Sequence, residues 1–189
     1  MNVKDMLRQA SDAAKQLITL SDQTIIGILK ETAQVLRTHT EEVLAANRQD
    51  LERMDPANPK YDRLKLTEER LQGIAADMEN VSTLPSPLNK VLSETTRPNG
   101  MVIRKVTVPF GVIGVIYEAR PNVTFDVFSL CFRSGNVCVL KGGSDADFSN
   151  RALVRIIHSV LERQGINPAV CTLLPPDREA TAELLGAVG

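Results

Sequence analysis

The sequence has few of the side chains that mark several common classes of protein. It contains no tryptophan and only 4% aromatic residues, which argues against the base-stacking surfaces of proteins that bind single-stranded nucleic acid. Its formal net charge of -1 predicts no general affinity for polyanions. No apolar run approaches the roughly 20 residues that a membrane span needs, and the first residues lack the apolar core of a secretory signal. We therefore expect neither nucleic acid nor membrane among its partners.

Cysteine is also scarce. The three cysteines, Cys131, Cys138 and Cys171, are odd in number and lack CxxC spacing, so they predict neither a disulfide framework nor a structural zinc site. A small, odd number of cysteines without paired spacing is typical of a protein in the reducing cytoplasm. Cys131 lies on the apolar stripe of a predicted helix, and the other two lie in predicted strands. We therefore expect three buried thiols that act as small hydrophobic side chains, and no metal site.

The stretch from 106 to 144 has the pattern of a strand–helix–strand unit. Residues 110–117 form an apolar run rich in Val, Ile and Gly, which is typical of a strand buried on both faces of a parallel sheet. The next segment is a predicted helix that ends at Gly135, where a helix C-cap is expected, and residues 137–140 predict a second buried strand. The residues of the helix that are expected to face the core are Val123, Val127, Leu130 and Cys131.

Two turns of this unit, residues 118–122 and 141–144, follow the carboxyl ends of predicted strands. Ligands of such sheets bind outside those ends. The first turn lacks the GxGxxG pattern of a standard dinucleotide site. The second begins with Lys141, at a position where an acidic residue would select NAD. A cation followed by two glycines and a serine suits the 2′-phosphate of NADP, although this pattern is also typical of a plain surface loop.

Hydrophobic periodicity predicts four helices before Pro85. Ser21 is expected to cap the second helix, and Thr67 the fourth. Between them, Thr38 and Glu41 have the spacing of a capping box that would open the third helix.

Residues 91–108 read as a β-hairpin, because two β-prone arms flank Pro98-Asn99-Gly100. The Asn-Gly pair predicts a type I′ turn, in which both central residues have positive φ. A polar two-stranded ribbon is marginal alone, so we expect it to lie against something else. At this point two interpretations stay open: an ordinary surface hairpin, or an arm that pairs with another subunit.

The alternation of helix and strand continues after Ser144. A helix ending near Gly165 precedes a strand at 171–174, and Asp177 can cap a last helix from Arg178 to about Val188. The predicted fold class is thus α/β, with three parallel strands, which is half of a dinucleotide-type sheet.

The resulting organisation has three parts. Residues 1–90 form a helical N-terminal segment of a cofactor domain, 91–108 a hairpin arm, and 109–189 a partial Rossmann-like sheet. Because the next parallel strand is missing, we expect that the chain is cut short.

The run from Val108 to Thr124, VPFGVIGVIYEARPNVT, resembles the signature of the gamma-glutamyl phosphate reductase (glutamate-5-semialdehyde dehydrogenase) family, within the aldehyde dehydrogenase superfamily. Weaker similarity extends over nearly the whole chain: 46–50, 61–67, 129–131, 134–137 and 140–143. The resemblance implies a sheet of the aldehyde dehydrogenase type. It also implies a cytoplasmic enzyme of proline biosynthesis, which reduces gamma-glutamyl phosphate with NADPH to glutamate 5-semialdehyde and releases phosphate.

The resemblance also implies roles for individual residues. Lys141 would meet the adenosine ribose, and Gly142, Gly143 and Ser144 would line the phosphate site of NADP. Asn122 would be a catalytic residue whose side-chain amide helps to form the oxyanion hole. Its alternative role is an ordinary helix N-cap.

Arg120 would bind a carboxylate or phosphate of the substrate, and its alternative is a surface ion pair with Glu118. The superfamily uses such hairpins to oligomerise, so the resemblance favours the interpretation of residues 91–108 as an arm between subunits of a homo-oligomer. Glutamate 5-kinase is a further partner that it suggests.

The main departure from the family concerns the nucleophile. The reaction needs a cysteine thiolate that attacks the acyl phosphate, and the family places it downstream in a second α/β domain. Two hypotheses follow: the chain is the cofactor-binding half of such a reductase, without the catalytic domain, or it is a non-catalytic NADP-binding or dimerisation module. The last residues, Ala187-Val188-Gly189, are not a finished strand, which favours the first. We expect the isolated chain to be inactive.

Overall fold

The parallel sheet forms the middle layer of the molecule. A computed structural model describes residues 2–187 and places three strands in the order β3-β4-β5. These strands are β3 (Val112–Ile116), β4 (Val137–Lys141) and β5 (Cys171–Leu173), and both pairings are parallel. The predicted α/β class and its three parallel strands are confirmed.

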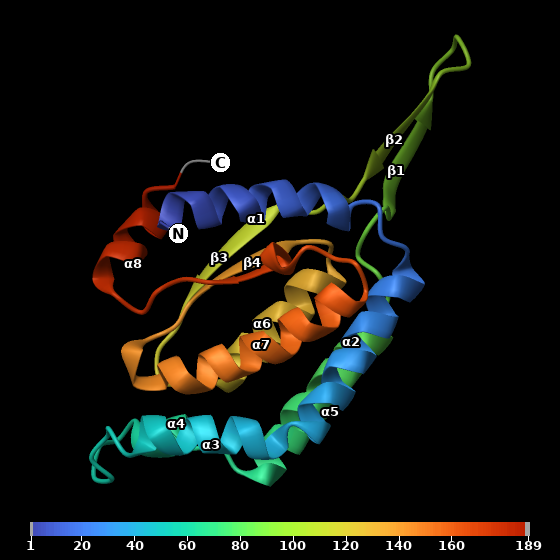
Figure 1. Cartoon of the computed structure of the whole chain (residues 1–189). Helices are drawn as coiled ribbons and strands as arrows, with labels where there is room; N and C mark the ends of the chain where they lie inside the picture. The colour runs from blue at the N-terminus through green and yellow to red at the C-terminus, as the bar shows by residue number, and fades with distance from the viewer. Residues whose placement is uncertain (1, 188–189) are drawn as a thin grey trace.

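Helices cover both faces of this sheet (Figure 1). Helices α1 (Val3–Leu17) and α8 (Arg178–Leu185) lie on one face, and α6 (Asn122–Arg133) and α7 (Asp147–Arg163) lie on the other. Strand β4 is therefore buried at every residue, because its alternating side chains meet a helix on each side.

Strand β3 differs from the prediction of burial on both faces. Its residues alternate between exposed and half-buried, because it is an edge strand and pairs only with β4 among the described strands. A groove between α1 and α8 leaves the side of Val112, Gly114 and Ile116 open. The prediction of a fully buried strand at 110–117 is wrong, although its position is confirmed.

A third layer of helices packs on α6 and α7, away from the sheet. It contains α2 (Asp22–Thr38), α3 (Thr40–Leu51), α4 (Tyr61–Leu64) and α5 (Glu68–Thr83). One continuous hydrophobic core runs from these helices through α6 and α7 to the sheet. None of the helices within residues 2–187 is long and apolar enough to cross a membrane.

Short 3-10 turns complete the chain path: η1 (Ser144–Ala146) precedes α7, and η2 (Pro168–Val170) precedes β5.

Most predicted helix caps are confirmed. The side chains of Ser21, Thr67 and Asp177 each accept a hydrogen bond from the backbone N–H three residues later. The predicted capping box at Thr38 is wrong. Thr38 is the last residue of α2, and its hydroxyl donates to the Val35 carbonyl, so it is not free to cap α3.

The buried face of α6 also differs from the prediction. The core side of this helix is made by three aromatic residues, Phe125, Phe128 and Phe132, whereas Leu130 is 55% exposed. Helix α6 lies between the sheet and α5, so two sides of it are buried and the aliphatic stripe does not decide its orientation. The rings of Phe128 and Phe132 stack with centroids 5.2 Å apart.

The hairpin projects from the rest of the molecule (Figure 1). Strands β1 (Val91–Thr96) and β2 (Val102–Val106) pair antiparallel, and every residue in them is exposed. The hairpin is confirmed, and the expectation that it lies against something else, such as another subunit, stays a prediction.

The predicted type I′ turn of the hairpin is also wrong. Gly100 has φ +84°, but Asn99 has no positive φ, and Gly100 N–H donates to the Arg97 carbonyl at 2.9 Å. Residues 98–100 thus form a three-residue loop that ends in a glycine. Pro98 is the second residue of the turn, where the fixed φ of proline is favourable.

A buried polar cluster joins α3 to the start of α7. The Asp50 carboxylate accepts hydrogen bonds from Phe148 N–H at 3.1 Å, Ser149 N–H at 2.7 Å and the Ser149 hydroxyl at 2.6 Å. It thus serves as the cap that α7 lacks in its own sequence. Burial raises the pKa of the Asp50 carboxyl, and the hydrogen bonds from Ser149 and Phe148 oppose that rise.

Asn47 extends the cluster to the segment after α4. Its amide nitrogen donates to the Leu64 carbonyl at 2.9 Å and to the Ser149 hydroxyl at 3.0 Å. Its carbonyl oxygen accepts from Leu66 N–H at 2.8 Å. The pair Asn47 and Asp50 therefore holds α3, residues 64–66 and the start of α7 in one arrangement.

Candidate functional site

The two predicted turns lie side by side at the carboxyl edge of the sheet. Strands β3 and β4 pair with Ile116 opposite Lys141, and Tyr117 N–H donates to the Lys141 carbonyl at 3.1 Å. The turn at 118–122 therefore leaves the sheet next to the turn at 141–144. Their approach is close enough that a Cβ atom at Gly143 would lie 3.7 Å from the Glu118 Cα.

Lys60, which precedes α4, connects the first of these turns with η1, the 3-10 turn that follows the second. Its ammonium lies 3.2 Å from a Glu118 carboxylate oxygen and 3.7 Å from an Asp145 carboxylate oxygen. The hydrogen bond to Glu118 is the main cause that raises the pKa of Lys60. The alternative interpretation of Arg120 as the ion-pair partner of Glu118 is therefore wrong, because Lys60 takes that place.

Asn122 is the first residue of α6, and its side chain does not cap the helix. The N-cap alternative is wrong because Pro121 already has helical backbone angles, so Asn122 lies inside the first turn. Its amide nitrogen donates instead to an Asp126 carboxylate oxygen at 3.0 Å. An amide nitrogen carries two N–H groups, so a second donor stays available to a ligand.

Asp126, the acceptor of this bond, has a perturbed pKa. Burial raises the pKa of its carboxyl, the Asn122 hydrogen bond opposes the rise, and the negative charge of Asp77 on α5 adds to it. The side chain of Asp126 thus fixes the orientation of the Asn122 amide from one turn further along the helix.

Arg120 and Asn122 line the same pocket, which has a volume of about 360 Å³. Its other walls are α4 with the segment that follows it, and one side of α5. The charged residues among its lining are Asp62, Arg63, Lys65, Arg70, Asp77 and Arg120. The structure therefore brings together the two predicted residues of the first turn, next to cations and anions that the sequence did not single out.

Lys141, at the end of β4, is 7% exposed and donates to the Pro176 carbonyl at 3.0 Å. This bond uses one of the three N–H donors of its ammonium group. Beyond it, Gly143 is half-buried and Ser144 is exposed. The backbone N–H groups of Phe148 and Ser149 at the start of α7 already donate to Asp50, so they are engaged within the protein.

A chain of hydroxyl and amide groups ties the site to the core. The Thr124 hydroxyl donates to the Asn150 amide oxygen at 3.1 Å, so the Tyr117 hydroxyl, 2.7 Å away, donates to Thr124. Burial raises the pKa of Tyr117 above its usual range. The amide nitrogen of Asn150 lies against Gly142, where an added Cβ atom would be only 2.2 Å away. This close contact requires glycine at 142.

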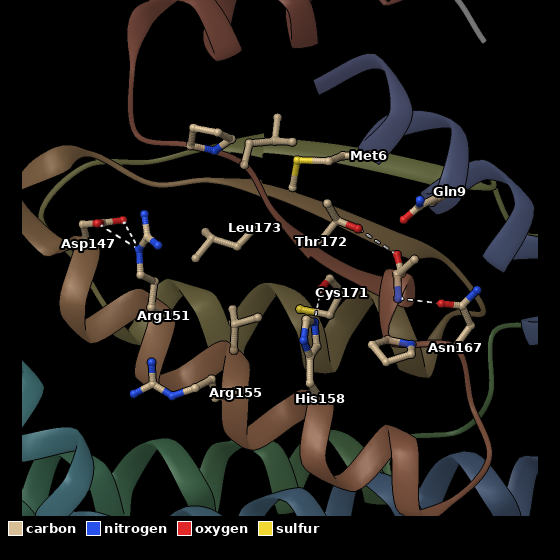
Figure 2. Close-up of a pocket in the computed structure, with 15 residues that line it drawn as sticks. Met6, Gln9, Asp147, Arg151, Arg155, His158, Asn167, Cys171, Thr172 and Leu173 are labelled. Atoms are coloured by element: carbon tan, nitrogen blue, oxygen red, sulfur yellow. Dashed lines mark hydrogen bonds and ion pairs between the residues drawn. The ribbon is translucent and has the colours of Figure 1, made fainter. Parts of the chain in front are cut away.

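A second concave region lies along the outer side of β5, between α1 and α7 (Figure 2). It has a volume of about 640 Å³, and none of the predicted site residues lines it. In it, a ring nitrogen of His158 lies 2.7 Å from the Cys171 carbonyl, and Arg151 pairs with Asp147 at 2.9 Å. These polar groups are thus already paired within the protein.

The three cysteines are buried, as predicted. Cys131 is 6% exposed, and Cys138 and Cys171 are fully buried. Burial raises the pKa of the Cys131 thiol to about 12. The neighbouring Cys171 thiol, together with burial, raises the pKa of Cys138. A nucleophilic cysteine needs an accessible thiol with a lowered pKa, and neither Cys131 nor Cys138 has one.

Comparison with known proteins gives a consistent result. No protein-family model matches the chain. A gamma-glutamyl phosphate reductase from Parabacteroides distasonis is 99% identical over 189 residues, which are 100% of this chain and 46% of that protein. The chain thus spans about half the length of the curated relatives it matches.

Solved structures agree with this similarity. The crystal structure of gamma-glutamyl phosphate reductase from Thermotoga maritima matches 98% of this chain and 46% of its own, with a TM-score of 0.93 and 31% identity. A probable aldehyde dehydrogenase from Listeria monocytogenes matches 98% of this chain and 39% of its own, with a TM-score of 0.74 and 17% identity, which is evidence of the fold alone.

The contact between Gly142 and Asn150 gives a test by stability. We expect Gly142→Ala to lower the free energy of unfolding by about 1–3 kcal/mol, because the new methyl group must displace the Asn150 amide. Urea unfolding measures the change. The matched control is Gly27→Ala in α2, where an added Cβ meets nothing within 4 Å. That control should raise the free energy of unfolding by up to about 1 kcal/mol, because alanine favours the helix more than glycine does. Equal effects of the two substitutions would contradict the assigned contact.

Proposed function

Because this chain is homologous along its whole length to gamma-glutamyl phosphate reductases, we propose that it supplies the cofactor-binding part of such an enzyme. The proposed reaction reduces gamma-glutamyl phosphate to glutamate 5-semialdehyde, with NADPH as reductant and phosphate as the leaving group, as a step of proline biosynthesis. The observation that carries this proposal is the placement of the Lys141 and Asn122 turns side by side at the carboxyl edge of the sheet.

The residues at the end of β4 fit a phosphorylated nucleotide. Lys141 has two N–H donors beyond the one that holds Pro176, and it is nearly desolvated, which strengthens its interaction with an anion. Gly143 and Ser144 are accessible next to it. When bound, NADPH supplies the hydride. We propose that Lys141 binds the adenosine ribose and its 2′-phosphate, and that residues 142–144 line the phosphates, so that NADP is favoured over NAD.

Asn122 is the proposed catalytic residue of the first turn. Negative charge develops on the acyl oxygen when a nucleophile attacks an acyl phosphate, and an oriented amide N–H stabilises that charge. Asp126 holds one N–H of the Asn122 amide at 3.0 Å, which supports a fixed direction for the other. Asp126 is therefore proposed as a positioning residue that acts through Asn122, and Arg120 as a ligand of the substrate's anionic groups.

The thiolate of the reaction is proposed to come from outside these 189 residues, because the three cysteines within them are buried. By this proposal the chain alone has no reductase activity. The free thiols suit a reducing compartment, so the cytoplasm is the proposed location. The contact with glutamate 5-kinase stays a prediction.

The hairpin is proposed to be an arm between subunits. Both strands carry large apolar side chains that are 43–59% exposed, among them Leu92, Val102 and Ile103. Exposed apolar strands of this kind pair with another chain unless they are covered.

The cofactor assignment is tested by titrating this chain with NADPH and NADH and following ligand fluorescence. We expect NADPH to bind about tenfold or more tightly than NADH, and Lys141→Ala to remove that preference, since a hydrogen bond to a charged group contributes about 1.5–3 kcal/mol. Lys15→Ala, on the exposed face of α1, is the control that should keep it. Equal affinities for the two cofactors in the unmodified chain would refute the NADP assignment. Oxidation of NADPH by the chain in the presence of substrate would refute its proposed inactivity.

The hairpin assignment is tested by sedimentation velocity over a range of protein concentrations. We expect the chain to associate, and Ile103→Glu in β2 to convert it to monomers, because a charge would be buried in the interface. Ile18→Glu is the matched control, since Ile18 is 70% exposed but lies between α1 and α2. An association that Ile103→Glu leaves intact, or a chain that is monomeric throughout, would contradict the arm.

A further inference from the structure

The pocket that contains Arg120 and Asn122 is lined by charges of both signs. Arg63 in α4 and Lys65 just after it lie on one wall with Asp62, whose carboxylate pairs with Arg70. Arg120 faces the same pocket from the turn before α6. Among the residues that the structure describes, 2–187, Arg63, Lys65 and Arg120 have no side-chain ion pair or hydrogen bond. Three cations that no carboxylate neutralises make this side of the pocket a site for an anion.

Arg70, a fourth cation of the pocket, has a structural role instead. Its guanidinium donates to the carbonyls of Asp62 and Lys65 at 2.5 and 2.6 Å, and to the Asp62 carboxylate at 3.1 Å. It therefore closes the end of α4 and holds the segment that carries Arg63. Arg63 and Lys65 thus lie on a wall that is fixed by this contact and by the bonds of Asn47 to Leu64 and Leu66.

Helix α5 contributes a carboxylate, Asp77, to the pocket. Asp77 lies four residues after Gly73 on α5, so both face the pocket from one side of the helix. Asp77 has no ion-pair or hydrogen-bond partner within the described part of the chain. Its charge acts on Asp126 of α6, whose pKa is raised by burial and further by Asp77. The two carboxylates therefore repel each other, and a bound ammonium group would relieve that repulsion.

A small ligand that carries both an ammonium and a carboxylate group matches this arrangement. The volume of about 360 Å³ lies in the range of small-molecule sites. We propose that this pocket recognises the α-amino-acid end of the substrate, with Asp77 as the residue that selects the α-ammonium group and Arg63, Lys65 and Arg120 as the ligands of the α-carboxylate. This inference rests on the proposed function, because it places the acyl end of the same molecule at Asn122.

The assignment of Asp77 has a specific consequence for binding. Glutarate is L-glutamate without its ammonium group, and 4-aminobutanoate is L-glutamate without its α-carboxylate. Of the three compounds, only L-glutamate carries an ammonium and a carboxylate group on one carbon atom, as the assigned α-amino-acid end requires. We expect L-glutamate to bind this chain about tenfold more tightly than either analogue, since one charge-assisted hydrogen bond is lost with each.

The experiment is a titration of the 15N-labelled chain with each of the three compounds, followed by amide chemical shifts. Asp77→Asn should weaken L-glutamate binding about tenfold and leave glutarate unchanged, so that the preference disappears. Asp12→Asn on α1, an equally conservative change of an exposed carboxylate, should keep the preference. Because Asp77 is exposed on α5, the variant should retain the far-ultraviolet circular dichroism of the unmodified chain.

Three results would overturn this inference: equal affinities for L-glutamate and glutarate, an unchanged preference in Asp77→Asn, or no saturable shifts at residues 73–77 and 120–122. A titration of the same sample with NADPH separates this failure from that of the proposed function. If NADPH binds with the expected preference and L-glutamate does not, only the assignment of the pocket is wrong.

Discussion

The candidate site depends on two buried polar side chains of α3, Asn47 and Asp50, which are both hydrogen-bonded to the Ser149 hydroxyl. Asp50 caps α7 directly after the turn that contains Lys141, and Asn47 holds residues 64–66, which form a wall of the pocket beside Asn122. Both side chains are 1% exposed, so an unpaired carboxylate or amide here would be strongly destabilising. The pair thus keeps the proposed cofactor turn and the proposed substrate pocket in a fixed relation, although they are built from different elements.

The buried strand β4 provides the second constraint. Its parallel register with β3 sets Ile116 opposite Lys141, and this brings the two functional turns to the same edge. The contact of Asn150 with Gly142, and the hydrogen bonds from Tyr117 to Thr124 to Asn150, then tie that edge to α6 and α7. The site therefore has rigid support from strands and helices, although its ligand-facing residues lie in turns.

Sequence reasoning found the features that have local signals. The caps at Ser21, Thr67 and Asp177, the buried strand β4, the hairpin and the two turns each follow from residues close together in the chain. Features decided by tertiary packing could not be found in this way. The bonds of Asp50 to Phe148 and Ser149 join residues 98 and 99 positions apart, and no periodicity in the sequence encodes them.

The same distinction applies to the site. Lys141 was singled out by its place at the end of a predicted strand and Asn122 by the family resemblance, and the structure brings their turns together. The prediction of the buried face of α6 was wrong because the sheet and α5 bury two sides of this helix. Its orientation is set by the three phenylalanines, which form the core side. The charges that join Arg120 in the pocket were missed because Arg63 and Asp77 come from separate segments, and each alone is typical of an ordinary exposed charge.

The proposed cofactor site lies at the adjacent turns that follow β3 and β4, and mapping of NADPH binding on the 15N-labelled chain tests this most directly. We expect the largest amide shifts at residues 141–144 and 118–122, next to one another at the carboxyl edge of the sheet. Shifts centred on the outer side of β5, at the groove that contains His158 and residues 171–175, would place the cofactor elsewhere and contradict it.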